Sequence, residues 1–325
     1  MDPLAGDDPV ASVLAAHEAG RDLVLTTSGT TARPRRVRRT TASWFDSFPV
    51  VRDLTGLGER SRLWVPGPLS GTMNLFARAL GRWAGAQPVA TAADATHAHL
   101  TPTALRRLLD EGHELGGRHV TVAGDRLDPR LHDRAVAAGA RVAHYYGAAE
   151  LSFVAWGPHA EDLRIFPGVA VREVDGVLRV RSPYLAQVPT DDDGFATVGD
   201  RGVVDGQGRV VVRGRGEAAV TTGGVTVPVA DVEAVLRGAV TCELVVVGVP
   251  HAELGEVVTA VLDDADEVVT ADACARARLR DTERPRLWFV ADELPRTGMG
   301  KTDRAAVRTL AADGALRRVS PVGVR

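Results

Sequence analysis

Lysine, cysteine and long apolar runs are nearly missing from this chain of 325 residues. Cys242 and Cys274 are its only cysteines, too isolated for a disulfide framework or a CxxC metal site, so we expect a reducing, cytoplasmic setting. No run of about 18 apolar residues occurs, and the acidic residues 1–9 do not resemble a signal peptide. A net charge of −3 gives no general attraction to nucleic acid or anionic lipid. We therefore expect a soluble protein that binds neither nucleic acid nor membrane.

The single lysine, Lys301, is the exception among basic residues, because the other 38 are arginine. A bias toward arginine wherever only positive charge matters explains the 38. A compact ammonium on a flexible stem differs chemically from a planar guanidinium. We therefore interpret Lys301 as a residue whose function arginine cannot supply.

The length favours two domains, and apolar runs that alternate between strand and helix periods through the first two hundred residues predict an α/β architecture. We expect strands at residues 22–27, 63–66 and 119–123, and helices at 73–83, at 103–110 and from Asp128-Pro129 onward. After Gly157, short alternating strands separated by Asp/Gly turns predict a hairpin-rich part.

Glycines gather at positions 214, 216, 223 and 224, ahead of a predicted helix at 229–237 and predicted strands at 243–249 and 256–262. Glycine-rich stretches commonly join domains, so we place the domain junction here. The Ala/Asp/Arg-rich stretch at 263–284 is interpreted as a surface loop and helix.

A hydroxyl-rich loop, residues 26–31, follows the first predicted strand. Its hydroxyls and main-chain N–H groups suit phosphate, although a threonine-rich turn that satisfies its own backbone is an equal alternative. Arginines follow at positions 33, 35, 36, 38 and 39. These arginines either reinforce anion binding or form a solvated face.

Two tempting motifs fail on spacing. Gly300-Lys301-Thr302 imitates the end of a P-loop, but Pro295 stands where that motif needs its first glycine. Ser70 lies in a Gly/Pro turn, but Pro68 occupies a position that a nucleophile elbow reserves for glycine. The sequence therefore predicts neither a P-loop nucleotide site nor a serine hydrolase.

Four segments in order resemble the signatures of the adenylate-forming superfamily, which includes acyl-CoA synthetases, peptide-synthetase adenylation domains and luciferases. They are Thr27-Ser28-Gly29-Thr30-Thr31-Ala32-Arg33-Pro34-Arg35, Tyr146-Gly147-Ala148-Ala149-Glu150, Gly199-Asp200 with Gly214-Arg215, and Leu294-Pro295-Arg296-Thr297-Gly298-Met299-Gly300-Lys301. The resemblance implies a truncated large domain, residues 1–214, which binds ATP and the acyl group. Its mixed sheet has flanking helices and a small β-rich subdomain. A small, mobile α+β C-terminal domain, residues 215–325, follows. The shortened first subdomain resembles short o-succinylbenzoate-CoA ligases.

The resemblance also implies a reaction and a set of roles. A carboxylic acid would be activated with ATP and Mg²⁺ to an acyl-adenylate, then transferred to coenzyme A. The implied residues are Thr27, Ser28, Gly29, Thr30 and Thr31 at the phosphates, Tyr146, Gly147 and Gly124 at adenine, Asp200 and Arg215 at the ribose, Glu150 at Mg²⁺, Lys301 in catalysis, Glu217 at the hinge, and Gly223 and Gly224 in the thioester step.

Each of these residues also has an ordinary structural interpretation. Glu150 suits a helix N-terminus, Asp200 a turn, Arg215 a solvated surface and Tyr146 a core. The glycines at 223 and 224 suit a plain turn. Only the joint order of the four segments favours the functional roles.

Several positions depart from the superfamily's pattern. Ala32 and Arg36 replace glycines and Arg35 replaces a lysine, while Ala149 replaces a threonine that by resemblance touches the α-phosphate. Leu69 stands where many members place a histidine or an aromatic residue beside the acyl pocket.

These departures leave two alternatives open. One is a catalytically degenerate binder of nucleotide or acyl-adenylate. The other is adenylation with transfer to a carrier protein or an amine. An apolar sheet face left by the missing subdomain would further favour a homodimer.

Overall fold

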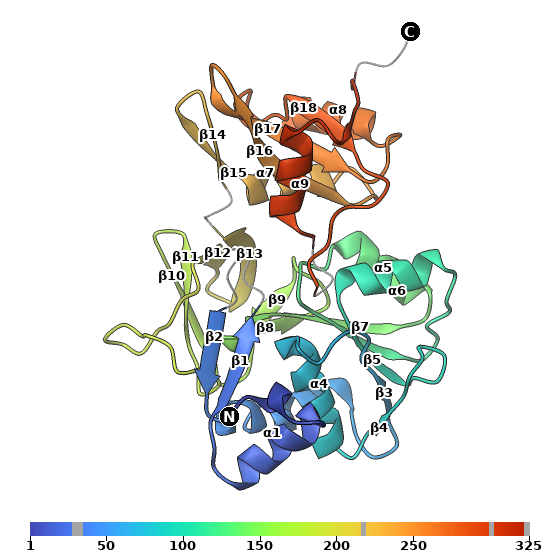
Figure 1. Cartoon of the computed structure of the whole chain (residues 1–325), viewed down its shortest axis with the longest axis vertical. Coiled ribbons are helices and arrows are strands. Elements are labelled where there is room, and N and C mark those ends of the chain that lie inside the picture. The colour runs from blue at the N-terminus through green and yellow to red at the C-terminus, as the bar shows by residue number, and fades with distance from the viewer. Residues whose placement is uncertain (28–34, 216–218, 299–301, 322–325) are drawn as a thin grey trace. The chain divides into compact units, whose positions relative to one another are not determined.

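The computed structural model describes residues 1–27, 35–215, 219–298 and 302–321. The chain divides into two compact units, the first at residues 1–212 and the second at residues 213–298 with the segment that begins at Thr302 (Figure 1). The division falls inside a single strand, next to the glycine cluster.

An 11-stranded mixed sheet, counted over the described residues, organises the first unit. In spatial order it comprises β10 (Ala170–Val174), β11 (Val177–Arg181), β12 (Asp200–Val204), β13 (Arg209–Arg215), β9 (Leu163–Ile165), β8 (Ser152–Gly157), β7 (Arg141–Ala148), β6 (His119–Val122), β5 (His97–Leu100), β3 (Arg62–Trp64) and β4 (Gln87–Pro88). Strands β3 to β7 pair in parallel, and β8 runs antiparallel to β7.

The parallel strands are covered on both faces, as parallel sheets generally are. One face packs alternate residues of β5 and β6, such as Leu100 and Val122, against α5 (Pro102–Asp110) and α6 (Pro129–Ala137). Asp128 caps α6 by accepting a hydrogen bond from the N–H of Arg130 at 2.8 Å, as its Asp-Pro start predicts. Hydrophobic alternation therefore fixes which face of these strands meets the two helices.

The N-terminal helices belong to a separate aromatic core. They are α1 (Pro9–Glu18), α2 (Ala42–Phe45), α3 (Phe48–Thr55) and α4 (Thr72–Trp83), and the short helix η1 (Pro3–Ala5) precedes them. Phe76 of α4 makes edge contacts with Trp44 at 5.3 Å and Phe48 at 5.2 Å between ring centroids. Val13 of α1 is fully buried in the same cluster, so α1 covers apolar surface of the core.

The second unit is a smaller α+β structure. Its sheet runs β15 (Val225–Pro228), β14 (Ala219–Thr222), β17 (Gly255–Leu262), β18 (Leu287–Val290) and β19 (Arg317–Arg318), and β16 (Leu244–His251) also pairs with β17. Its helices are α7 (Val229–Arg237), α8 (Val268–Arg278) and α9 (Arg304–Ala312). Val246 and Val258 lie in the core with α7 and α8, whereas Val247 and Val257 pack with α9.

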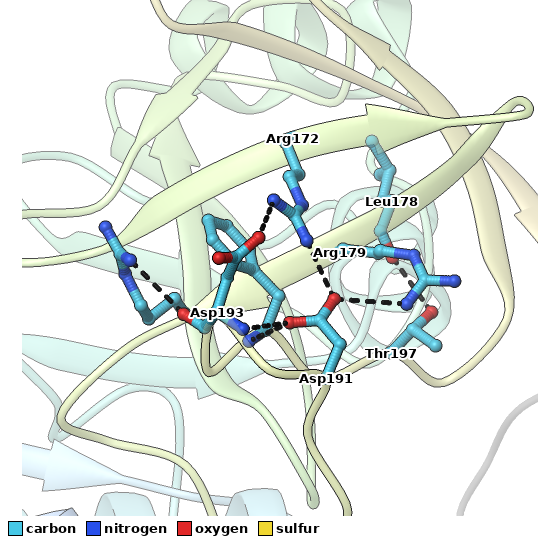
Figure 2. A network of polar contacts seen from close by, with 8 residues as sticks. Arg172, Leu178, Arg179, Asp191, Asp193 and Thr197 are labelled. Atoms are coloured by element: carbon cyan, nitrogen blue, oxygen red, sulfur yellow. Dashed lines mark hydrogen bonds and ion pairs between the residues drawn. The ribbon is translucent and has the colours of Figure 1, made fainter.

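An ion-pair network braces the hairpin of β10 and β11 (Figure 2). Asp191 accepts hydrogen bonds from Arg172 at 2.8 Å and from Arg179 at 3.3 Å. The Asp191 carboxylate also accepts a hydrogen bond from the backbone N–H of Phe195. This bond is the main reason that the pKa of Asp191 lies below its ordinary value, and Arg172 lowers the pKa further. The Arg172 guanidinium lies 4.1 Å from the Phe195 ring. These contacts fix the loop ahead of β12.

The α/β fold with a mixed sheet and flanking helices is confirmed. The helix predicted at 229–237 is α7, and the helix within 263–284 is α8. Helices α1 and α3 were not predicted. Among the described residues, no helix combines the length and the apolar character needed to cross a membrane.

Candidate functional site

Tyr146 and Asp200, two residues of the resembling motifs, meet directly. Tyr146 lies near the end of β7, Asp200 begins β12, and the tyrosine hydroxyl donates a 2.6 Å hydrogen bond to Oδ2 of Asp200. The Asp200 side chain is buried, with a residue exposure of 8%. A contact over 54 positions of sequence therefore joins the predicted adenine and ribose residues into one cluster.

Two glycines of this cluster have structural reasons to be glycine. Gly147 lies at an irregularity in the β7–β8 pairing, where a Cβ would come within 2.1 Å of the carbonyl oxygen of Ser152. Gly124 follows β6 with φ of 90°, a conformation that favours glycine. Any larger residue at Gly147 would displace the neighbouring strand β8, which sets the turn beyond it.

Glu150 lies in the tight turn between β7 and β8, where Leu151 N–H donates to Ala148 O at 3.1 Å. The helix N-terminus considered for Glu150 is therefore wrong. Its backbone carbonyl accepts from Ala186 N–H at 2.8 Å, and its side chain is half-buried. Ser152, after the turn, has φ of 58°. The backbone of this turn is thus held from outside as well as by its own hydrogen bond.

Arg39 also holds this turn through hydrogen bonds. The sequence analysis did not identify this role. The side chain has an exposure of 0%. Its guanidinium donates to Ala149 O at 3.0 Å, Ser152 Oγ at 2.8 Å and Tyr184 O at 2.7 Å. Burial lowers the pKa of Arg39 to about 9, and the nearby negative charge of Glu150 opposes that shift. Arg39 therefore places buried positive charge beside the Glu150 turn.

The arginine run is consequently split between two faces of one strand. In β2 (Arg35–Arg39), which pairs with β1 (Leu23–Thr27), Arg36 and Arg38 are exposed while Val37 and Arg39 are buried. Arg38 pairs with Asp22 at 2.9 Å on the surface. The solvated face predicted for this run is correct for Arg36 and Arg38 and wrong for Arg39. Strand alternation was the signal that could have identified the inward position.

The predicted phosphate loop connects two paired strand ends. Thr27, the last residue of β1, pairs with Arg35, the first residue of β2. Ser28, Gly29, Thr30 and Thr31 lie outside the described residues, as do Ala32 and Arg33. The structure therefore fixes the backbone from which the loop starts and to which it returns.

The remaining predicted residues lie after position 212 in the sequence. Arg215 ends β13, while Glu217 and Lys301 lie outside the described residues. Gly223 and Gly224 form the two-residue turn between β14 and β15, with φ of 56° and 80°. Two consecutive positive φ values are typical of a tight hairpin turn and account for glycine at both positions.

Two arginine–carboxylate pairs hold the backbone on either side of Lys301. Arg296 pairs with Glu243, and Arg304 pairs with Glu233, whose side chain is 4% exposed. Burial alone would raise the pKa of Glu233, but Arg237 and Arg304 outweigh burial and keep that pKa below its ordinary value. Asp303 N–H donates to Pro295 O at 2.7 Å. The segment that contains Lys301 therefore begins and ends at fixed points.

Comparison with curated proteins identifies relatives across nearly the whole chain, although no family model matches the sequence. A probable 2-succinylbenzoate–CoA ligase of Mycobacterium tuberculosis is 31% identical, with 94% of this chain and 92% of that protein covered. A 4-chlorobenzoate–CoA ligase of an Arthrobacter species is 40% identical over 121 residues, which are 36% of this chain. That match spans only 23% of the chlorobenzoate ligase.

Solved structures share the fold. ATP-bound MatB of Rhodopseudomonas palustris superposes with a TM-score of 0.79 at 24% identity, covering 90% of this chain and 68% of that one. The AMP complex of O-succinylbenzoate coenzyme A synthetase from Bacillus subtilis gives a TM-score of 0.70 at 22% identity, covering 88% and 68%. The fold, the joined Tyr146–Asp200 cluster and the near-complete match to the mycobacterial ligase lead to one conclusion: the chain belongs to the family of AMP-dependent acyl-CoA ligases.

Proposed function

We propose that the protein activates a carboxylic acid with ATP and transfers the acyl group to coenzyme A. In the first step a carboxylate oxygen bonds to the α-phosphorus as the bond to pyrophosphate breaks, leaving an acyl-adenylate. In the second step the thiol sulfur of coenzyme A bonds to the acyl carbon, AMP leaves, and the thiol proton goes to solvent. The observation that carries this proposal is the Tyr146–Asp200 hydrogen bond, within a chain of this family.

The first unit would hold the nucleotide. Tyr146, with Gly124 and Gly147, would face adenine. Asp200, whose carboxylate has a second oxygen beside the one bonded to Tyr146, would accept a hydrogen bond from the ribose. Backbone N–H groups and hydroxyls of Thr27, Ser28, Gly29, Thr30 and Thr31 would hold phosphate oxygens.

Glu150 fits the magnesium ion that ATP chemistry requires. Mg²⁺ in nucleotide sites takes one or two carboxylates together with substrate phosphates and water. Glu150 is half-buried in the turn between β7 and β8. Bound there, the ion would neutralise charge on the phosphates.

In this proposal the mobile C-terminal domain, residues 215–325, would supply the catalytic cation. Lys301 would stabilise the negative charge that develops as the carboxylate attacks, and Arg215 would contact the ribose. Rotation at Glu217 would then exchange Lys301 for Gly223 and Gly224 in the thioester step, since a few residues at a domain junction can absorb such a motion. The domain boundary at 214/215 is part of this proposal.

Exchange of labelled pyrophosphate into ATP tests the first step without any acceptor. We expect exchange with at least one acid from a panel of aryl, short-chain and succinyl-aryl acids. Addition of coenzyme A should then convert the adenylate to a thioester that is detectable by mass spectrometry. Absence of exchange with every acid, despite ATP binding measured by calorimetry, would favour a second function.

That second function is a catalytically silent binder of nucleotide or acyl-adenylate. Ala149 favours it, because its side chain offers no hydroxyl to the α-phosphate while its carbonyl is already bonded to Arg39. Transfer to a carrier protein or an amine is the alternative for the acceptor. Thioester formation with coenzyme A alone, compared with a carrier protein, separates these acceptors.

A homodimer remains part of the proposal. A homodimer is expected if apolar surface of the first unit is left uncovered. Part of that surface is covered within the chain, because α1 buries Val10, Val13 and Ala16 in the aromatic core. Light scattering at micromolar concentration decides the question. A monomer would mean that the helices of the chain itself cover the apolar surface.

A further inference from the structure

A cavity of about 30 Å³ lies in the first unit, between α3 and α4 on one side and β5, β6 and β7 on the other. Its lining is mostly aliphatic and aromatic, and it includes Phe76, His97, His99, Thr121, Tyr145 and Phe153. A volume of this size holds about two water-sized groups. The cavity therefore has room for a small substituent beyond what the packed core already contains.

The sheet face that lines this cavity is unusually polar. The strands β5 and β6 are buried on both faces, so both sets of alternating residues should be apolar. The face toward α5 and α6 obeys that rule, but the face toward the cavity carries His97, His99 and Thr121. Polar side chains at buried positions carry a cost unless they find partners, so they indicate a requirement other than packing.

The two cavity histidines differ in hydrogen bonding. His97 is satisfied, since its Nε2 lies 3.1 Å from Thr55 O and its Nδ1 lies 3.0 Å from Thr96 Oγ1. His99 is 7% exposed, and its buried Nδ1 has no hydrogen-bond partner among the described residues. Burial lowers the pKa of His99 to about 4, so its imidazole is neutral near pH 7 and offers one donor and one acceptor.

The cavity and the nucleotide cluster use neighbouring positions of the same two strands, and because side chains alternate along a strand, Tyr145 and Tyr146 pack into different cores. Tyr145, whose ring stacks on His99 at a centroid distance of 5.8 Å, precedes Tyr146, which bonds Asp200. Phe153 pairs in register with Gly147. One strand pair thus carries cavity residues next to the residues proposed to hold adenine and Mg²⁺.

We propose that this cavity receives the far end of the acyl group, and that the acid is a compact aryl monocarboxylate whose uncharged hydroxyl bonds to His99. This inference rests on the proposed adenylation. The cavity takes only the hydroxyl-bearing edge of the acid, and the rings of Phe76, Tyr145 and Phe153 in its lining favour an aromatic edge there. The hydroxyl matches a neutral imidazole because each group has both a donor and an acceptor.

The same lining excludes acids with a second carboxylate. No Arg or Lys is among the described residues that line the cavity. A carboxylate placed there would lose its hydration without gaining a cationic partner, which is strongly unfavourable. The small volume also excludes long acyl chains. The chain should therefore differ in substrate from its relative named for 2-succinylbenzoate, which carries two carboxylates.

Pyrophosphate exchange with matched acids tests this inference. The acids are benzoate, 3-hydroxybenzoate, 4-hydroxybenzoate, terephthalate and 2-succinylbenzoate. We expect kcat/KM for one hydroxybenzoate to exceed that for benzoate by about tenfold or more, since an unpaired buried group is left when the hydroxyl is missing. His99→Phe should abolish this preference, and His99→Gln should restore part of it. His132→Phe, on α6 and outside the cavity lining, is the control and should keep it.

The outcomes separate the two proposals. Exchange that shows no hydroxyl preference, a preference unaffected by His99→Phe, or faster exchange with 2-succinylbenzoate would overturn the substrate class and leave adenylation standing. Absence of exchange with every acid would count against adenylation. Calorimetry with the preferred hydroxybenzoate alone then decides about the cavity: tighter binding by wild type than by His99→Phe supports it, and equal or absent binding overturns it.

Discussion

Arg39 and Arg172 lie on strands of the same unit, yet they are placed in opposite ways. Arg172 sits on the exposed hairpin of Figure 2 and pairs with two carboxylates, those of Asp191 and Asp193, each at 2.8 Å. Arg39 is fully buried and donates to carbonyl and hydroxyl oxygens instead. Paired charges cancel locally, whereas Arg39 keeps its positive charge beside the Glu150 turn. The comparison teaches that an arginine's hydrogen-bond partners, more than its charge, decide its role.

Replacement of Arg39 should cause the largest loss of stability. Arg39→Met leaves Ala149 O and Tyr184 O buried without a donor, and we expect a loss of roughly 3–5 kcal/mol in the free energy of unfolding. Urea denaturation measures it. Arg38→Met is the matched control, because Arg38 is the exposed neighbour on the same strand. Equal stability of the two variants would contradict the contrast between buried and exposed arginines.

Lys301 is a third cationic side chain to compare with Arg39 and Arg172. Arginine should not be able to replace it in adenylation. Lys301→Ala should slow pyrophosphate exchange by about 100-fold or more, since one positioned charge contributes roughly 2.7–4 kcal/mol to a transition state. Thioester formation from supplied acyl-adenylate should be nearly unchanged. Lys301→Arg should fail in the same way as Lys301→Ala. Normal exchange by the arginine variant would remove the role assigned to this lysine.

Burial also changes the pKa of a histidine, and the effect can be measured as a dependence of stability on pH. The pKa of His99 is about 4 in the folded chain against 6.5 for the ordinary side chain, because burial disfavours the charged form. Between these values the unfolded chain binds a proton that the folded chain does not. Stability should therefore fall as pH drops from 6.5 to 4, by up to about 3 kcal/mol from this group. His99→Phe should show a shallower decline in urea denaturation, and an identical decline would contradict the assignment.

A hydroxyl introduced at position 149 should have a moderate effect on the rate of pyrophosphate exchange. The Ala149 carbonyl is held by Arg39, so a threonine side chain there would start from a fixed backbone. We expect Ala149→Thr to raise the exchange rate about tenfold with little change in ATP affinity, because the new contact forms mainly in the transition state. Ala148→Thr is the neighbouring control. An unchanged or lower rate in Ala149→Thr would indicate that another group already serves the phosphate.

The exposed network should matter least. Arg172→Ala removes ion pairs that water screens, and such pairs contribute little to stability. We expect the melting temperature to change by about 1 °C and pyrophosphate exchange to stay the same. A loss comparable to that of Arg39→Met would show that the Asp191 loop supports the site through β12.

Sequence reasoning succeeded where periodicity and end signals agree. The helix α7 matches its predicted range, and the Asp128-Pro129 start of α6 is confirmed by the Asp128 cap. The two strands predicted in the parallel sheet, at 63–66 and 119–123, match β3 and β6 to within two residues, whereas β4, β5 and β7 were not predicted. These elements depend on local contrast between apolar and polar positions, which a single sequence displays directly.

The site was only partly accessible in this way. The motifs predicted Tyr146 and Asp200 but not their hydrogen bond, because pairing across 54 residues depends on how the sheet assembles. Arg39 was hidden by the arginines on either side of the same strand, and His99 by an alternation that places histidine where a buried face should be apolar. Arg39 and His99 can be identified as inward-facing when the alternation of strand side chains between two faces is used for polar residues as well as for apolar ones. The roles of the loop residues and of Lys301 stay predictions.

The two edges of the central sheet limit how copies of this chain can associate. At one edge β4 is only two residues long and ends in Pro88, which lacks a backbone N–H. At the other edge β10 carries Arg172 and Glu173, and charged side chains disfavour the docking of another strand. Continuous strand addition, the usual first step toward fibrous aggregates, is therefore blocked at both ends. Self-association through this sheet should therefore use side-chain surfaces rather than shared backbone hydrogen bonds.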